Sequence, residues 1–305
     1  QRIIQIDSFP ERDNEKLRVF EEVKMSVCIM ISKKIKKQGN YNFNLNIWED
    51  KFMNSSRHIL LNNIEVLGLD IENASIPSLS QAELNTLKKI SANKRLISYA
   101  KCYEGEINLT FHKYLLNKNP SGSAPMIKGA AVQKWFIKEK MSQGEIEYLD
   151  SVAYLQNNKG KKSQHHKLKR IVMQGITGVD ENNRLKMTLI SPNVFCGNSV
   201  NYILITDKNL SYEFLLGVLN SHLLNWYFKV FSTNSNVNGY EVDNLPLPDI
   251  AGINQEPLSN LVDQILNIKR ANPLADISDL QAAIDQEVNF LYGLKKEEVK
   301  LIERE

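Results

Sequence analysis

Residues 213–231 read EFLLGVLNSHLLNWYFKVF, and this stretch decides which part of the chain forms the core. It predicts one helix that begins after Ser211 and carries apolar residues on nearly every side. A helix that is apolar all round has no face for water, so it belongs in the interior of a domain. We therefore expect this helix to be buried.

After this helix the sequence predicts a polar loop and then two amphipathic helices. The loop reads STNSNVNG at 232–239, and the prolines of NLPLPDI at 244–250 argue against regular structure there. The first amphipathic helix places Leu258, Val262 and Ile265 on one face. The second begins with the capping-box pattern Ser278-Asp-Leu-Gln281.

Before the buried helix, the region from about 105 to 206 reads as mainly β. The segments that suggest strands are MIKGAAVQKWFI (126–137), RIVMQGITGV (170–179), RLKMTLI (184–190) and VNYILIT (200–206). Each of the first two contains a glycine, which predicts a bulge or the close approach of another backbone. Further upstream, the capping box Ser80-Gln-Ala-Glu83 starts another helix.

The first fifty residues predict strands that lack a core of their own. Strands are expected at 2–6, 23–31 and 41–48, with a short helix at 13–22. The last strand alternates Tyr41, Phe43, Leu45 and Ile47 with asparagines, so one face should meet water. So few residues cannot bury a core, and we interpret them as the trailing edge of a larger α/β sheet.

Composition indicates an ordinary globular protein of about two compact units. The chain has 305 residues, of which 42% are hydrophobic and 24% charged. Cys28, Cys102 and Cys196 are far apart and odd in number, which argues against a disulfide framework and favours a reducing cytosol. No apolar run is long enough to span a membrane, so no membrane contact is expected.

Motifs for catalysis are weak or missing. No glycine-rich nucleotide turn and no GxSxG sequence occurs, and Asn119-Pro120-Ser121-Gly122 lacks the second proline and the aromatic residue of a methyltransferase turn. The Glu-x-Lys fragments at 22–24 and 298–300 read as surface charge. Adjacent histidines on a strand would face opposite ways, so His165 and His166 favour solvation or phosphate contact over zinc. We predict no catalytic residue, metal site or cofactor site in this chain.

Positive charge is concentrated in KGKKSQHHKLKR, residues 159–170. Six lysines and arginines lie there, and no acidic residue occurs between Ser151 and Val179, although the whole chain has a formal charge of only +3. A basic loop that projects from a sheet can follow a phosphate backbone. If six phosphates were neutralised, log affinity would fall against log salt with a slope of roughly −5. Amide side chains nearby could read adenine.

A family resemblance follows from three kinds of segment. The run GVLNSHLLNWYFKVFSTNSNVNGYEVDNLPLPDI (217–250) resembles the C-terminal specificity region of Taq-like restriction–modification adenine-N6 methyltransferases. GEINLT (105–110) and MIKGAAVQKWF (126–136) are similar to segments of the large fused type IIS/IIG enzymes. The opening IIQIDSFPERDNEKLRVFEEVKMSVCIMI resembles the last strands of their methyltransferase domain, and the two closing helices resemble the family's ending.

The resemblance implies an α+β fold with a β-rich target-recognition domain and C-terminal helices, preceded by the last strands of a Rossmann-like methyltransferase sheet. It implies three parts: residues 1–57 from the methyltransferase sheet, 58–250 for DNA recognition and 251–305 as a helical segment. The implied partners are double-stranded DNA and N-terminal methyltransferase or nuclease domains of the same cytoplasmic polypeptide. S-adenosylmethionine, and Mg²⁺ for a nuclease, would belong to those domains.

Together, the residue pattern and the resemblance give a set of expected DNA contacts. Cations of the basic stretch would contact phosphates or the major groove, the Gly129 strand would lie near DNA, and amides would contact bases. The predicted residues are Lys128, Gln133, Lys134, Lys161, Lys162, Gln164, His165, His166, Lys167, Lys169, Arg170, Gln174, Asn234, Asn236 and Asn238. The three asparagines could equally satisfy turn backbone, and Trp135 reads as a core residue.

Three alternatives to a recognition module stay open. The chain could itself be a small nuclease or methyltransferase. It could be the specificity subunit of a type I restriction system, although no second, repeated recognition half is visible. It could also be an interaction protein whose basic loop is only solvated.

Overall fold

The computed structural model describes residues 2–9, 16, 18–21, 26–36, 39–70, 74–139, 147–178, 182–232 and 235–303. The chain forms two compact units, Gln1–Lys88 and Lys89–Glu305. The expected three-part division at residues 57 and 250 stays a prediction, and most of the helix expected at 13–22 lies outside the described residues.

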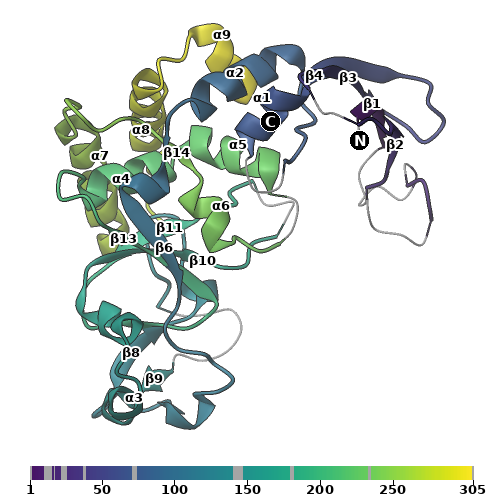
Figure 1. The fold of residues 1–305 in the computed structure, drawn as a ribbon. Coiled ribbons are helices and arrows are strands. Elements are labelled where there is room, and N and C mark those ends of the chain that lie inside the picture. The colour runs from purple at the N-terminus through teal and green to yellow at the C-terminus, as the bar shows by residue number, and fades with distance from the viewer. Residues whose placement is uncertain are drawn as a thin grey trace. The chain divides into compact units, whose positions relative to one another are not determined.

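The first unit contains a four-stranded sheet in the order β2-β1-β3-β4 (Figure 1). Strand β1 runs parallel to β3, whereas the pairs β1–β2 and β3–β4 are antiparallel. The short helix α1 follows, and α2 begins in this unit. The bounds are β1 (Arg2–Ser8), β2 (Cys28–Lys33), β3 (Asn42–Trp48), β4 (Ser56–Asn62), α1 (Asn63–Leu69) and α2 (Gln81–Ser91).

The two faces of this sheet differ as the alternation in β3 predicts. Phe43 and Leu45 are buried on one face. On the other face Asn42 and Asn44 are exposed as expected, whereas Asn46 is buried. Asn46 and Trp48 donate to the carboxylate of Asp7 at 2.8 and 3.0 Å. The capping box at the start of α2 is also confirmed, because Ser80 N donates to Glu83 at 2.6 Å and Glu83 N donates to Ser80 Oγ at 3.3 Å.

The described residues of the second unit form three sheets with helices around them. A four-stranded sheet has the order β11-β10-β13-β6, a second has the order β12-β8-β9-β7, and β14 pairs with β5. The strands are β5 (Lys94–Arg95), β6 (Ala100–Glu104), β7 (Leu116–Asn117), β8 (Ala124–Ile127), β9 (Tyr148–Leu149), β10 (Arg170–Gln174), β11 (Met187–Ile190), β12 (Phe195–Cys196), β13 (Val200–Ile205) and β14 (Pro246–Leu247). The expected α+β class is confirmed.

Helices of this unit follow or interrupt the strands. The α-helices are α3 (Ser151–Asn157), α4 (Tyr212–Leu219), α5 (His222–Phe231), α6 (Gly239–Asp243), α7 (Glu256–Ala271), α8 (Ser278–Leu291) and α9 (Lys296–Ile302). The 3-10 helices are η1 (Leu96–Ser98), η2 (Lys113–Leu115), η3 (Gly129–Ala131) and η4 (Lys161–Lys167). Among the described residues, no helix combines the length and apolarity needed to cross a bilayer.

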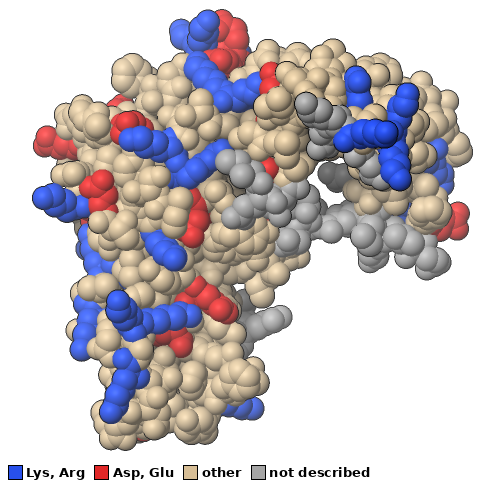
Figure 2. All heavy atoms as spheres, viewed as in Figure 1, with Lys and Arg blue, Asp and Glu red and all other residues tan. Residues whose placement is uncertain are grey.

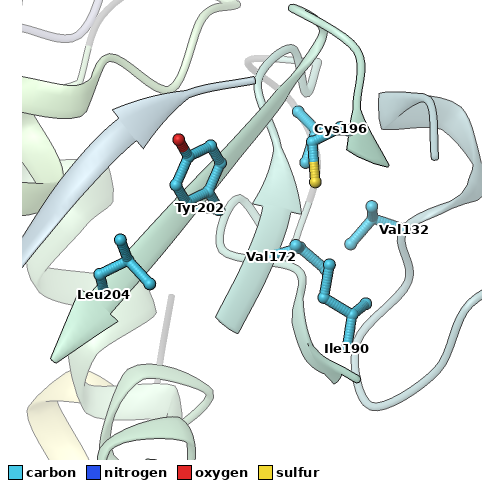
Figure 3. Close-up of a cluster of buried hydrophobic side chains, with 7 residues drawn as sticks. Val132, Val172, Ile190, Cys196, Tyr202 and Leu204 are labelled. Carbon is cyan, nitrogen blue, oxygen red and sulfur yellow. The ribbon is translucent and has the colours of Figure 1, made fainter. Parts of the chain in front are cut away.

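Among the described residues, an apolar cluster packs on each four-stranded sheet of the second unit. In the first, Val172, Tyr202 and Leu204 of adjacent strands pack with Val132 and Cys196 (Figure 3). The second joins Ile107, Leu115, Met126, Leu149, Tyr154 and Phe195. We call the part of the chain built on this second cluster the distal lobe, comprising residues 105–128, 147–168 and 194–198.

Two glycines let the sheets meet at Ser199. A Cβ added to Gly129 would lie 2.3 Å from the Ser199 carbonyl oxygen, and one added to Gly175 would lie 2.9 Å from it. Gly175 N also donates to that oxygen at 2.9 Å, and Gly129 N donates to Ser199 Oγ at 2.9 Å. The expected close approach of another backbone is confirmed. The strand expected at 126–137 is wrong beyond Ile127, because the chain turns into η3 at Gly129.

The helix expected at 213–231 is buried but broken into α4 and α5. Asn220 Nδ2 donates to the Met187 carbonyl at 3.0 Å, and Asn220 Oδ1 accepts from Met187 N at 3.2 Å. Ser221 Oγ then accepts from Leu224 N at 3.2 Å as the N-cap of α5. The break thus lets the helices bond to the strand beside them.

Two smaller expectations for the C-terminal part are wrong. Pro246 lies in β14, since a two-residue strand can use the proline carbonyl without its missing N–H. Ser278 is not the cap of α8, because its own N–H and hydroxyl bind Asp276 at 3.0 and 2.6 Å. Helix α7 packs on α4, and α8 packs on α4, α5 and α7, so these helices cover the buried pair.

Candidate nucleic-acid interface

The basic segment is a 3-10 helix fixed to the distal lobe, and not the loop that was expected. Ser163 Oγ donates to the carbonyls of Asn158 and Gly160, at 2.6 and 2.7 Å. His166 is only 6% exposed and stacks on Phe195 with 4.3 Å between ring centroids. Residues three apart share one side of a 3-10 helix, so Ser163 and His166 anchor the same side of η4.

His165 adds a third anchor. Its Nδ1 lies 2.9 Å from the hydroxyl of Tyr202, and its ring meets the edge of Tyr103 at 4.9 Å. Partial burial and the positive charges of Arg170 and Lys162 lower the pKa of His165. The imidazole is therefore held neutral near pH 7, and these geometries make His165 and His166 anchors of the segment.

Four lysines project from this anchored segment. Lys159, Lys161, Lys162 and Lys167 are exposed, as is Gln164. Within the part of the chain that the structure describes, no ion pair involves any of the four lysines. Their charge is thus available to an anionic partner, and the rigid base lowers the entropic cost of contact.

The other two cations of the stretch are already paired with acidic residues. The Lys169 amine forms an ion pair with Glu213 and lies 5.5 Å from the ring centre of Tyr212. Arg170 is fully buried and binds Glu106 through NH1 at 2.9 Å. Arg170 therefore cannot contact a phosphate, and its expected role is wrong because β10 turns this side chain into the core. Lys169 is exposed but already paired.

The expected DNA strand around Gly129 is a tight hairpin. Lys128 pairs with Glu147 at 2.5 Å, and Gln133 Nε2 donates to the Val132 carbonyl at 2.8 Å. Burial lowers the pKa of Lys134 to about 8, and the negative charge of nearby Asp285 opposes this shift only in part. Lys128 and Gln133 are thus bonded within the chain, and Lys134 is largely shielded from solvent.

Trp135 holds the tip of the same hairpin in a strained conformation. Its φ of +78° lies in the left-handed region that a bulky residue rarely adopts. The indole is 2% exposed and donates to Gln281 at 3.1 Å. The interpretation of Trp135 as a core residue is confirmed.

The amides differ in their availability. Gln174 Nε2 donates to the Val132 carbonyl at 2.7 Å, and the Asn238 side chain binds Glu241 at 3.0 Å at the start of α6. Asn236 is exposed and its backbone pairs with Ile176. Asn234 lies outside the described residues. Asn238 thus satisfies its turn, the second of the two roles considered for it.

The positive excess of the chain lies on the distal lobe. The lobe contains seven of the 38 lysines and arginines but only three of the 35 acidic residues, Glu106, Glu147 and Asp150. The other residues thus carry 31 cations and 32 anions. Figure 2 shows lysine and arginine side chains along the part of the view where Figure 1 places α3, β8 and β9. Since Glu106 and Glu147 are paired, the lobe is a cationic surface.

Sequence reasoning missed the partners that fix this surface. Tyr103 belongs to β6, Glu106 to the segment between β6 and η2, and Tyr202 to β13, all of them more than 30 residues from the basic stretch. No local signal marks Glu106 as the partner of Arg170, because Glu104 lies two residues before it and 64 residues separate Glu106 from Arg170. Among the described residues, no group of three His, Cys, Asp or Glu side chains could hold a metal ion.

Comparison with known proteins gives one sequence family and a shared fold. No curated protein sequence matches the chain. The structure of MmeI, a type IIL restriction–modification enzyme in complex with DNA, matches with a TM-score of 0.53 and 10% identity, covering 99% of this chain and 44% of MmeI. This identity shows a common fold alone, and the chain spans less than half of the MmeI chain.

Two other structures are less similar. The type IIG restriction endonuclease BpuSI has a TM-score of 0.42 at 12% identity, covering 99% of this chain and 43% of BpuSI. The HsdS subunit from Thermoanaerobacter tengcongensis has a TM-score of 0.34 at 12% identity, covering 69% of this chain and 50% of HsdS. Neither score adds to the fold assignment.

The sequence of residues 124–247 matches the TaqI-like C-terminal specificity domain, which confirms the resemblance found in the sequence.

Proposed function

We propose that this chain recognises a sequence of double-stranded DNA within a restriction–modification enzyme and positions a separate adenine-N6 methyltransferase domain, with or without a nuclease. The single observation that carries the proposal is the match of residues 124–247 to the TaqI-like specificity domain. The chain itself is then a binding module and not the catalyst.

The anchored lysines support this role. Lys159, Lys161, Lys162 and Lys167 are exposed on or beside the rigid η4 helix, inside the matched region. Four phosphate contacts give a slope of log affinity against log salt of about −3.6, smaller than the six-contact value because Lys169 and Arg170 bind acidic residues. Such contacts position a duplex, while base edges are read by other groups.

The sheet of the first unit supports an attached α/β domain. All six residues of β2 are exposed, including Ile29, Met30 and Ile31, which are 52%, 53% and 46% exposed. An apolar edge strand is a template for further pairing, so residues 1–57 fit the last strands of a methyltransferase sheet. S-adenosylmethionine, and Mg²⁺ if the parent cuts DNA, would bind to N-terminal domains of this cytoplasmic polypeptide.

Selection from a random duplex pool tests the proposal. The 305-residue chain is expected to enrich a defined sequence, and its affinity for that duplex should fall with salt at a slope of about −3.6. A scrambled duplex of equal length is the control for sequence preference. Absence of salt-sensitive binding would contradict recognition and favour an interaction protein.

Turnover assays separate this proposal from a self-contained enzyme. The chain is incubated with the selected duplex and either Mg²⁺ or labelled S-adenosylmethionine, and neither cleavage nor methyl transfer is expected. Product in either assay would show that the chain is itself an enzyme. Selection of a site in two separated halves would instead favour a type I specificity subunit.

A further inference from the structure

The distal lobe carries a second exposed feature, an aromatic turn at residues 108–115. Phe111 and Tyr114 are 76% and 74% exposed, although both are large apolar rings. Contiguous exposed apolar surface bordered by polar residues is typical of contact sites.

Hydrogen bonds fix the turn at its start. Asn108 Oδ1 accepts from the backbone N–H groups of Thr110 and Phe111, both at 3.0 Å. The His112 ring accepts from Asn108 N through Nδ1 at 3.1 Å, and His112 N donates to the Asn108 carbonyl at 2.9 Å. The backbone around Phe111 is therefore ordered by its own side chains.

The inward side of the turn is packed on the lobe. His112 meets the Tyr154 ring edge to face at 5.2 Å, and Leu115 is 7% exposed in the second apolar cluster. His112 and Leu115 are three residues apart, as are Phe111 and Tyr114, and residues three apart lie on one side of a 3-10 turn. Because His112 and Leu115 are held inward, Phe111 and Tyr114 both face outward.

Charge around the turn selects the occupant. Lys113 is exposed between the two rings and has no ion pair with any described residue, and the lobe holds the positive excess of the chain. Helix α3 packs on η2, and η4 follows α3 after three residues. Seven helical residues span about 10 Å, close to the width of a DNA groove of about 12 Å. Asp150 N, at the start of α3, donates to the carbonyl of Leu115 in η2 at 2.9 Å, whereas η4 follows the end of α3, so η2 and η4 adjoin opposite ends of this helix.

We infer that Phe111 and Tyr114 are a second DNA contact, in which Phe111 wedges at a base step of the duplex and Tyr114 packs on the adjoining backbone. The inference rests on the proposed function, since it assumes that the lobe binds DNA. Apolar wedges unstack a base step and favour flexible steps such as TA or CA. This contact adds preference through DNA deformability, whereas the lysines add only electrostatic attraction.

Fluorescence and affinity measurements test the contact on the full chain. The probe is the duplex selected by the wild-type chain, with 2-aminopurine placed at each position in turn. Wild-type protein should raise fluorescence at one step, while Phe111→Ala should abolish that rise and weaken binding about tenfold with an unchanged salt slope. Tyr114→Ala should weaken binding less and keep the fluorescence, and Phe111→Leu should retain most of both.

Phe290→Ala is the matched control, because Phe290 of α8 is also 76% exposed. It should change neither readout, and urea unfolding should show that all variants remain folded. If Phe111→Ala matches wild type in affinity and fluorescence while salt-sensitive binding persists, this inference fails and the proposed function stands. A wild-type chain that binds no duplex overturns both. Loss of self-association in sedimentation, with unchanged DNA binding, would identify a protein contact and overturn the inference.

Discussion

Arg170 and Glu106 form an ion pair with no exposed side-chain surface. The NH1 group of Arg170 donates to both carboxylate oxygens of Glu106, at 2.9 and 3.1 Å. The guanidinium also lies over the ring of Tyr202 at 4.7 Å, and its NH2 group bonds to the Val194 carbonyl. The buried guanidinium of Arg170 thus connects β10 with β13 and with the two segments of the distal lobe that contain Glu106 and Val194.

Removing the carboxylate should destabilise the chain strongly. Glu106→Ala leaves the Arg170 charge buried without its partner, which costs about 3 to 5 kcal/mol in the free energy of unfolding. Urea unfolding measures the change. The double variant E106L/R170M should recover most of the loss, because apolar groups replace both charges. A single variant as stable as wild type would contradict the central role of this pair.

Arg170 and Glu106 also show why the sequence predicted the exposure of only some side chains in the basic stretch. Lysine spacing predicted a cationic surface, and Lys161, Lys162 and Lys167 are indeed exposed. Arg170 has the same local composition around it, yet its partner Glu106 lies 64 residues away. Local sequence cannot distinguish an exposed cation from one that a distant carboxylate draws into the core.

Elements with local causes were predicted well. The Ser80 cap and the alternation in β3 depend on neighbours within a few residues, and both are confirmed. The break in the buried helix depends on Asn220 binding Met187, 33 residues earlier in the chain. Tertiary hydrogen bonds of this kind override helical periodicity.

Loss of three exposed lysines should change the salt dependence of DNA binding. The variant K161S/K162S/K167S removes three of the proposed phosphate contacts, so the slope of log affinity against log salt should become less negative by about 2.7. Sequence preference should persist, because phosphate contacts carry no base information. Fluorescence anisotropy at several salt concentrations measures both.

The control variant K208S/K296S/K300S removes the same charge from exposed lysines outside the distal lobe. Its slope should stay close to that of wild type. Equal effects of the two triple variants would indicate general electrostatic attraction and not a defined contact surface.

Burial of Lys134 predicts a pH dependence of stability. Its pKa of about 8 in the folded chain lies below the unfolded value near 10.4. Between these values the unfolded chain binds more protons, so stability should rise as the pH increases from about 8 to 10. Below pH 8 the full penalty for charging this amine applies.

Lys134→Met should therefore stabilise the chain at pH 7, by about 1 to 3 kcal/mol, and flatten this part of the pH profile. Urea unfolding at pH 7, 8, 9 and 10 gives the comparison. K208M, at an exposed lysine, should follow the wild-type curve. Equal pH profiles for Lys134→Met and wild type would contradict the assignment.

The contact of Gly129 with Ser199 predicts intolerance of a methyl group. Gly129→Ala would place Cβ against a backbone oxygen, and the required shift should cost about 1 to 3 kcal/mol or more in the free energy of unfolding. Gly160→Ala is the control, because no atom lies within 4 Å of its Cβ position. Thermal unfolding compares the two, and equal midpoints would exclude strain at Gly129.

The buried and exposed side chains of η4 differ in function, and this difference determines which substitutions the segment can accept. Ser163 and His166 are buried and hold the segment, whereas Lys161, Lys162, Gln164 and Lys167 are exposed between and beside them. Replacement of an outward side chain leaves the interior intact. Exchange of these outer side chains can therefore change the charge that the segment offers to an anionic partner, without a compensating change in the scaffold that carries them.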